Sequence, residues 1–521
     1  MTDQTPPPDK ATSIVDTLQS LLVAFVLAMV FRGFVVEGFV IPTGSMAPTL
    51  LGQHLLVKSP QTGVETPIGL DARGRPDLGR LRDHSTGRSE PLQPRKSELR
   101  PRAGDRVLVL KTLYPFRTVD RWDVTVFRNP TQPEGPAANF IKRTIGLPGE
   151  SIWIVDGDIF VKSKGDEAFH IARKPDAVQK GVWQRFHDEA NPPARPEALA
   201  RGSGSPWTPA PADTWTHEGP VWTHEGTGQG SLTWDDTRFP LDDWTAYNMF
   251  SPVPTFPMSD LKVSATVTLD ASASAQFQLA ARSHLFSFTL GTDSVSVKIS
   301  RTTDGELKPQ FEQTHEGLIA NTPTRVEIEH RDQMLILRLD GREVVRETLD
   351  WSPRQRLEFS RGLINSTMSD EELTRHLPQG PQLRWLVDGG AVNLGGLAVD
   401  RDLFHRRDVL RQNAVSHAAP ADRADEVRPG MPAAATAPSS ILHLKDDQYF
   451  MLGDNSGRSN DGRLWGWPHP MVAQQVDPDP FVVNEDLLVG KAFVVYYPAA
   501  HSITDGGMGL IPDFGRLRFI R

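Results

Sequence analysis

The sequence predicts a mainly β protein with one N-terminal membrane-spanning helix and a large inserted β-sandwich. One long apolar run lies near the N-terminus, and no second run of that length follows it. Short β-branched segments bounded by turn residues come next, with no helix-length period between them. A central block of period-2 segments differs in composition from both flanks. Strands this numerous at such spacing indicate a second antiparallel domain of jelly-roll-like type.

Composition excludes several classes of protein. At 521 residues the chain has room for about two to four domains. Its 38% apolar and 23% charged residues suit a globular protein rather than a multi-span membrane protein. A formal charge of −9 is small for this length, so we expect no nucleic-acid partner. The absence of cysteine excludes disulfides, zinc ribbons and thiol catalysis, and we expect no cofactor and no metal.

The apolar run is predicted to be a single uncleaved membrane anchor over 17–36, preceded by a polar tail over 1–16. A bilayer span needs about 20 mostly apolar residues, and Arg32 can extend to the membrane interface. A buried core helix is the alternative. A cleavable signal peptide is disfavoured because the tail lacks a basic start and a small-residue exit site. The charges flanking the run leave its orientation open.

Short strands are expected after the anchor. Asp156-Gly157, flanked by alternating isoleucines, predicts a two-residue hairpin turn. The polar stretch 59–101 has no periodicity and is predicted to be a surface loop. The strands themselves are expected within 104–111, 121–130 and 139–161.

The block 166–440 is predicted to be the inserted sandwich. Its Pro/Gly-rich entry repeats "WTHEG", but the H-E-x-x-H spacing of a zinc helix is absent, so a turn is favoured over a metal site. Period-2 segments follow, and Asp340-Gly341 predicts another hairpin. The Ala/Pro-rich stretch 413–440 is predicted to be a flexible exit linker. We therefore expect a separable domain, which a short link could replace without loss of the surrounding fold.

Two polar loops are candidate site segments. Ser45 lies in "VIPTGSMAPTL" (40–50), directly after the apolar run. By composition alone this is an ordinary turn, because Gly, Pro, Thr and Ser are turn residues for steric reasons. A glycine-rich loop, "GDNSGRSNDGRLWG", ends the strand-like run within 446–467. Loops at strand ends are where functional sites are commonly built.

Five motifs occur in one order after the apolar segment: "IPTGSMAPTL", "GDRVLV", "RWDVTVF", "FIKRTIGLPGE" and "GDNSGRSNDGRLWG". As a set they resemble the bacterial type I signal peptidases, membrane-bound serine/lysine proteases that remove signal peptides from exported proteins. The resemblance implies a β catalytic domain in two parts, 37–165 and 441–521. It also implies an inner-membrane enzyme with the tail 1–16 in the cytoplasm and the catalytic domain on the extracytoplasmic side. Signal peptides and membrane lipid are the implied partners.

The resemblance assigns the chemistry to two residues, Ser45 as nucleophile and Lys142 as general base. A serine hydroxyl is a poor nucleophile until a neighbouring group takes its proton. Lysine can do so only when neutral, and its reference pKa of about 10.4 must be lowered by burial. The apolar neighbours of Lys142 in the sequence could supply that burial.

The resemblance also implies a supporting set. Thr43 is expected to help the Ser45 N–H form an oxyanion hole, and Ser459 to hold the lysine in place. Asp461 and Arg463 are expected to form a structural acid–base pair with Arg143. The pockets for small side chains at the −1 and −3 substrate positions are implied around residues that pattern alone would assign to the core: Phe39, Ile41, Pro42, Met46, Leu50, Phe140 and Ile141.

Two other functions stay open. One is a membrane-tethered binding protein whose sandwich recognises a glycan or a protein while the peptidase part is only a scaffold. The other is a self-cleaving repressor with the same dyad, which the anchor and the lack of a helix-turn-helix pattern disfavour. The joint presence of Ser45, Lys142 and Ser459 favours an enzyme, because a scaffold has no chemical need for all three.

Overall fold

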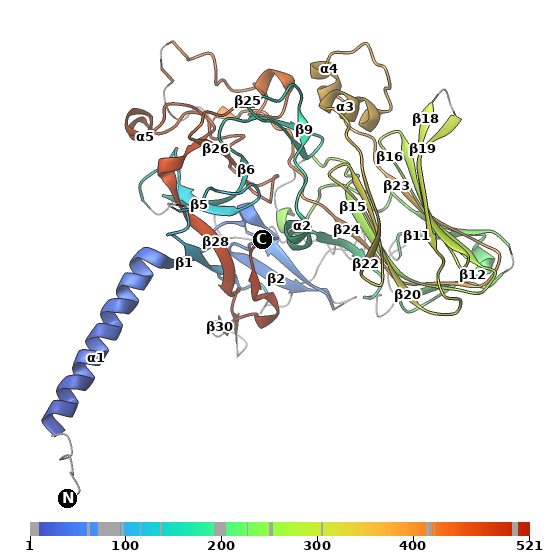
Figure 1. The fold of residues 1–521 in the computed structure, drawn as a ribbon, viewed down its shortest axis with the longest axis horizontal. Helices are drawn as coiled ribbons and strands as arrows, with labels where there is room; N and C mark the ends of the chain where they lie inside the picture. The colour runs from blue at the N-terminus through green and yellow to red at the C-terminus, as the bar shows by residue number, and fades with distance from the viewer. Residues whose placement is uncertain are drawn as a thin grey trace, which may run out of the picture.

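The computed structural model describes residues 10–59, 63–70, 94, 98–114, 116–135, 138–191, 205–226, 228–249, 254–303, 306–412, 417, 419–420, 422–502 and 509–521. A long N-terminal helix projects away from two β bodies that lie next to each other (Figure 1). The first body, which we call the catalytic body, combines chain from both ends of the sequence, and the second is built from the central residues. This arrangement confirms the predicted fold class.

The apolar run forms α1 (Lys10–Val30), which continues into one wider helical turn, Phe31–Val35. The stretch Ile14–Val35 has a mean hydropathy of 2.2, and none of its apolar window is buried inside the protein. A soluble core helix would be buried, so the length, composition and exposure of this helix are consistent with a membrane anchor or a signal sequence. Its end is fixed to the catalytic body by Lys111, whose Nζ donates to Gly33 O (3.1 Å).

The catalytic body is built on an eight-stranded antiparallel sheet, and strands occur within each segment where the sequence predicts them. Alternating side chains of its strands pack on one face of the sheet, where they form an apolar core with Met46 and Leu50 of the segment that follows β1. β31 (Arg518–Phe519) pairs with β28, and the other strands follow the order β1 (Val36–Val40), β4 (Arg106–Leu110), β28 (Leu488–Tyr497), β5 (Val124–Arg128), β6 (Asn139–Gly146), β26 (Gln448–Leu452) and β27 (Val483–Asn484).

A four-stranded extension carries the predicted hairpin. Asp156 and Gly157 both have positive φ, 47° and 90°, as a two-residue turn between right-twisted strands requires. The hairpin prediction is confirmed. The strands of this extension follow the order β25 (Leu442–His443), β7 (Ser151–Val155), β8 (Asp158–Lys162) and β9 (His170–Ile171).

The predicted surface loop 59–101 is wrong at its start. β2 (His54–Lys58) pairs with β3 (Glu65–Gly69), and Val57 and Ile68 are fully buried between them and a neighbouring segment. A proline within the short run "ETPIG" hides this strand from a pattern search, because proline is rare inside strands. Most of the remaining loop lies outside the described residues.

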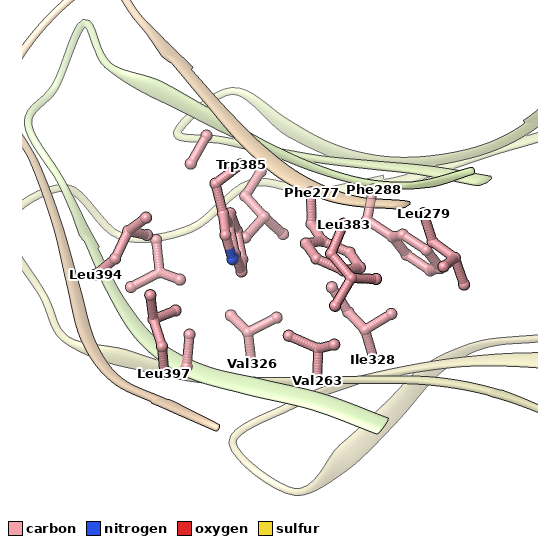
Figure 2. Close-up of a cluster of buried hydrophobic side chains, with 14 of the residues drawn as sticks. Val263, Phe277, Leu279, Phe288, Val326, Ile328, Leu383, Trp385, Leu394 and Leu397 are labelled. Carbon is pink, nitrogen blue, oxygen red and sulfur yellow. The ribbon is translucent and has the colours of Figure 1, made fainter. Parts of the chain in front are cut away.

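The central residues form a β-sandwich of two antiparallel sheets. Phe277 and Trp385 from one sheet face Val263 and Val326 from the other, and they make a continuous apolar core (Figure 2). One sheet has the order β12 (Trp215–Glu218), β13 (Val221–His224), β24 (Val392–Arg401), β15 (Leu261–Leu269), β20 (Thr324–Arg331), β21 (Met334–Leu339) and β22 (Arg342–Thr348), with β10 (Gln184–Asp188) on β24. The other has the order β11 (Trp207–Ala210), β14 (Gly230–Trp234), β23 (Gln382–Asp388), β16 (Ser274–Ala281), β17 (His284–Gly291), β18 (Ser294–Thr303) and β19 (Glu306–Glu316).

The last part of the predicted exit linker, 433–437, is packed against the protein rather than exposed. Ala433 and Ala435 are fully buried, and the Ile154 N–H donates to Ala435 O (2.6 Å). Small side chains allow the segment to approach β7 closely, so an Ala/Pro-rich composition here reflects packing and not a linker. Part of the predicted linker, 413–416 included, lies outside the described residues.

The sandwich is joined to the catalytic body by buried ion pairs. α3 (Pro353–Arg361) follows β22 and lies over the tip of the β7–β8 hairpin. Arg361 forms a bidentate pair with Asp156 (2.7 and 2.9 Å), and Arg356 pairs with Asp158. Removing one partner of a buried pair is costly, because it leaves an uncompensated charge. The insertion is therefore joined to its host by buried charges, and its separability stays a prediction.

Candidate active site

Ser45 lies in a single 3-10 turn, Gly44–Met46, just after β1. The Ala47 N–H donates to Gly44 O (3.1 Å) and the Leu50 N–H to Met46 O (2.8 Å), which closes the turn. Met46 and Leu50 are fully buried in the core of the catalytic body. These two apolar side chains hold one side of the turn in the core, while Ser45 keeps 8% of its surface exposed.

Lys142 lies on β6, opposite Thr125 of β5, and its Nζ is 2.7 Å from Ser45 Oγ. Only 4% of its surface is exposed. Burial lowers the pKa of Lys142 to about 8, although the carboxylates of Asp461 and Asp454 act in the opposite direction. A much larger neutral fraction therefore exists near neutral pH than for a lysine in water, and a neutral amine can accept the serine proton.

Arg143, the next residue on β6, points away from Lys142 and forms a fully buried bidentate pair with Asp454 (2.8 and 2.7 Å). The Thr49 hydroxyl, in the segment that follows Ser45, also donates a hydrogen bond to the Asp454 carboxylate (2.5 Å). The expected grouping of Arg143 with Asp461 is wrong. Asp454 instead connects the lysine strand to the serine segment, because a carboxylate has enough lone pairs for both donors.

Asp461 and Arg463 form their own bidentate pair (2.9 and 2.8 Å), in which both side chains are fully buried. Arg463 also donates to Ser456 Oγ (2.6 Å) and to Arg406 O (2.8 Å). The pair thereby fixes the glycine-rich loop after β26. Within the described chain, the carboxylate of Asp461 receives the Gly453 N–H (3.0 Å), which ties the start of that loop to its end.

The Ser459 hydroxyl is buried, but within the described residues no hydrogen bond joins it to Lys142. It lies near the carboxylate of Asp461, whose pKa is raised by burial but held below its ordinary value mainly by the charge of Arg463. Gly453 lies between this hydroxyl and the Ser45 carbonyl, and a Cβ there would overlap both. Glycine is therefore required at 453 for the loop to approach the serine turn.

Thr43 precedes the turn with an extended backbone (φ −122°, ψ 161°), and its side chain makes no capping hydrogen bond. The residue is exposed. The first N–H groups of a helical turn have no partner inside it. The Ser45 N–H and the Thr43 hydroxyl are thus donors on the same short segment.

The seven expected pocket residues divide by burial. Phe39 and Ile141 are half-buried and pack at the edge of the cluster that the fully buried residues form. A cavity of about 860 Å³ lies beside Phe39, between the end of the N-terminal helix and β28. Phe140 belongs to a separate cluster and its ring lies 5.0 Å from Lys142 Nζ. Pro42 is exposed, whereas the fully buried members are Ile41, Met46 and Leu50.

Sequence reasoning missed three residues that build this site: Thr49, Gly453 and Asp454. All lie inside or next to the quoted motifs, so proximity to Ser45 and to the glycine-rich loop was the available signal. Among the described residues, no group of three or more histidine, aspartate or glutamate side chains is placed to hold a metal ion.

A serine hydroxyl hydrogen-bonded to a buried lysine, on an antiparallel β scaffold, is the arrangement of a serine/lysine acyl-transfer site. Residues 96–191 match the family model described as signal peptidase, peptidase S26. This part of the chain, which contains Lys142, is similar to that family.

Curated relatives of low identity show the same similarity to signal peptidases. Signal peptidase I of Pseudomonas aeruginosa is 28% identical over 145 residues, which is 28% of this chain and 36% of that protein. Signal peptidase I of Leptolyngbya laminosa is 27% identical over 187 residues (34% and 66%). That of Pseudomonas fluorescens is 24% identical over 242 residues (45% and 68%). The chain spans only about a third of the length of the first of these relatives.

Solved structures similar to the sandwich have very different sequences. The carbohydrate-binding module CBM66 from Bacillus subtilis is 11% identical with a TM-score of 0.23, over 38% of this chain and 96% of that one. The β-agarase A structure is 7% identical with a TM-score of 0.24, over 36% and 76%. Scores this low assign no ligand to the sandwich.

Proposed function

We propose that this protein is a signal peptidase, an endopeptidase that removes N-terminal signal peptides from exported preproteins. The observation that carries the proposal is the 2.7 Å contact between Lys142 Nζ and Ser45 Oγ, in a site where burial lowers the lysine pKa to about 8. The signal peptidase family of residues 96–191 supports the choice of substrate.

In the proposed mechanism, neutral Lys142 takes the Ser45 hydroxyl proton as Oγ attacks the scissile carbonyl carbon. The negative charge that develops on the carbonyl oxygen is stabilised by the Ser45 N–H and the Thr43 hydroxyl. Lys142 then gives its proton to the leaving amine of the mature protein. A water molecule, deprotonated by Lys142, hydrolyses the Ser45 ester, releases the signal peptide and regenerates the serine.

The supporting residues have positioning roles in this proposal. Arg143 and Asp454 hold the lysine strand against the serine segment, and the Asp461–Arg463 pair holds the glycine-rich loop. Ser459 packs against Gly453 and so limits how the glycine-rich loop approaches the serine turn. The substrate would lie along the half-buried Phe39 and Ile141, with the buried apolar residues of the expected pocket limiting the side chains that fit.

Cleavage of a model preprotein by the full-length protein in detergent tests the proposal. Ser45→Ala and Lys142→Met are expected to lower the cleavage rate at least about 10³-fold, since they remove the nucleophile and its base. Lys164→Met is the matched control, because Lys164 is an exposed lysine (81% of its side chain). Wild-type rates in either dyad variant would contradict the mechanism, and an inactive wild type would favour the binding-protein alternative.

We also propose that α1 anchors the protein in the inner membrane, with both β bodies on the extracytoplasmic side. The exposed apolar helix and the family support this placement. Protease added to spheroplasts is then expected to digest the sandwich. Full protection of the sandwich in intact spheroplasts, with digestion after lysis, would contradict the orientation.

A further inference from the structure

A segment of the inserted domain reaches the serine turn. Between β14 and β15 the chain leaves the sandwich and forms a short 3-10 turn, Ala246–Asn248. The side chain of Thr245 accepts a hydrogen bond from the Tyr247 N–H and begins this turn. Asp243, earlier in the same segment, pairs with Arg406 (2.8 Å), whose carbonyl receives Arg463. The start of the segment is therefore fixed before the chain reaches the turn that carries Ser45.

The Tyr247 ring forms one wall of the serine turn. Tyr247 is 3% exposed and packs in a cluster with Ala47 and Leu51, the residues that follow the nucleophile. Its ring lies so close to Gly44 that a Cβ at that position would overlap it. The same ring closes on Gly69 of β3. The backbone beside Ser45 thus has no room to move toward the insertion while Tyr247 is in place.

Asn248 acts on the same turn through hydrogen bonds. Its amide and the amide of Asn455 bond reciprocally, at 2.7 and 2.9 Å. Asn455 in turn donates its side-chain N–H to Gly44 O (2.9 Å) and its backbone N–H to Ser45 O (3.0 Å). Asn248 therefore orients the Asn455 side chain, which holds the Gly44 carbonyl from the glycine-rich loop.

These two contacts act on the peptide units that decide where Ser45 Oγ and its N–H point. The Gly44 carbonyl belongs to the same peptide unit as the Ser45 N–H, so holding this carbonyl fixes the direction of the N–H. A displacement of about 1 Å at a reacting group can cost about 10²-fold in rate. Interactions that fix this peptide unit act on the chemical step more than on substrate binding.

We propose that Tyr247 and Asn248 are positioning residues for Ser45, so that the inserted sandwich domain completes the geometry of the nucleophile. This rests on the proposed signal peptidase function. The insertion is then a part of the enzyme, because it supplies one wall of the serine turn and half of the amide pair that orients it.

Steady-state kinetics of the full-length protein on a model preprotein test the proposal. Asn248→Ala is expected to lower kcat at least about tenfold and to leave KM within about twofold, with Tyr247→Ala showing the same split. Because Asn248 acts through Asn455, the double variant with Asn455→Ala should be no slower than Asn455→Ala alone. Asn393→Ala, at an exposed site of the sandwich whose side chain bonds Thr223, is the control and should match the wild type.

Hydrogen–deuterium exchange decides the inference separately from the proposed function. Asn248→Ala is expected to speed exchange in peptides covering 42–53, while exchange in the sandwich strands stays at the wild-type level. Unchanged exchange over 42–53 would overturn the inference even if the wild type cleaves preprotein. Additive loss in the double variant, or a change in KM alone, would also overturn it.

Discussion

The two β bodies bury their charged groups in different places. In the sandwich, the buried pair Arg282–Asp260 lies at strand ends, directly after β16 and directly before β15. The sandwich has an apolar interior, in which Phe277 and Trp385 of one sheet meet Val263 and Ile328 of the other (Figure 2). The catalytic body buries its charged groups beside Ser45 and Lys142, and four of them form the two bidentate pairs Arg143–Asp454 and Arg463–Asp461. Lys142 is buried there without a carboxylate in hydrogen-bond contact among the described residues.

Apolar contacts and buried ion pairs contribute different things: the first mainly stabilise the fold, and the second mainly fix the geometry of the groups they join. Apolar burial is non-directional and tolerates small shifts, so it suits a body whose task is to hold a surface in place. Buried ion pairs contribute little net stability, but their hydrogen bonds fix distances and angles. The catalytic body uses directional contacts where Ser45 must face Lys142, and the joint between the bodies uses them again at Asp156 and Asp158.

We expect the largest effect when residues 184–401 are replaced with a short Gly/Ser link. We expect loss of cleavage and of a cooperative melting transition, because Asp156 and Asp158 lose their arginines and Asn455 loses Asn248. Preprotein cleavage and thermal melting are the measurements. A deletion variant with wild-type cleavage would restore the separable insertion that the sequence suggests.

Trp385→Ala tests the apolar interior by itself. Trp385 is fully buried between the two sheets, and truncating a buried aromatic side chain costs about 3–5 kcal/mol. Urea unfolding should show that loss, whereas kcat at temperatures below the transition should stay at the wild-type value. A large fall in kcat of the folded variant would show that the sandwich core also positions the site.

Asp454→Asn tests the buried pairs. The substitution keeps the shape but leaves the Arg143 charge uncompensated, which should cost about 3 kcal/mol and lower kcat as the serine segment loses Thr49's partner. Asp446→Asn is the control, since its ion pair with Lys164 is exposed and should contribute little. Equal effects of the two substitutions on unfolding would contradict the role of the buried pair.

The smallest expected effect is a pH dependence of the chemical step. Because burial lowers the pKa of Lys142 to about 8, its neutral form is lost as pH falls through that value. The cleavage rate should be nearly constant above about pH 8.5 and fall about tenfold per pH unit below about pH 7.5. The unfolded lysine keeps its ordinary pKa, so Lys142 also lowers the free energy of unfolding below about pH 8, and this penalty fades toward pH 10.5. A rate independent of pH between 6 and 9 would contradict Lys142 as base.

Local patterns were sufficient for much of the fold. The apolar run, the Asp156-Gly157 and Asp340-Gly341 turns and the period-2 strands depend on neighbouring residues, and the structure confirms them. The motifs also singled out Ser45 and Lys142, since each stands in a distinctive short context. Patterns failed where packing overrides composition, as for the strand "ETPIG" and the buried alanines of the expected linker.

The sequence by itself determined which residues have suitable chemistry: a hydroxyl at 45, an amine at 142 and an arginine at 143. Tertiary structure alone decided what each one meets. It placed Lys142 against Ser45 across 97 positions, gave Arg143 the partner Asp454 rather than Asp461, and brought Asn248 from the insertion to the serine turn. The reason is physical: a hydrogen bond or ion pair acts over about 3 Å, and only the folded chain brings residues so distant in sequence that close.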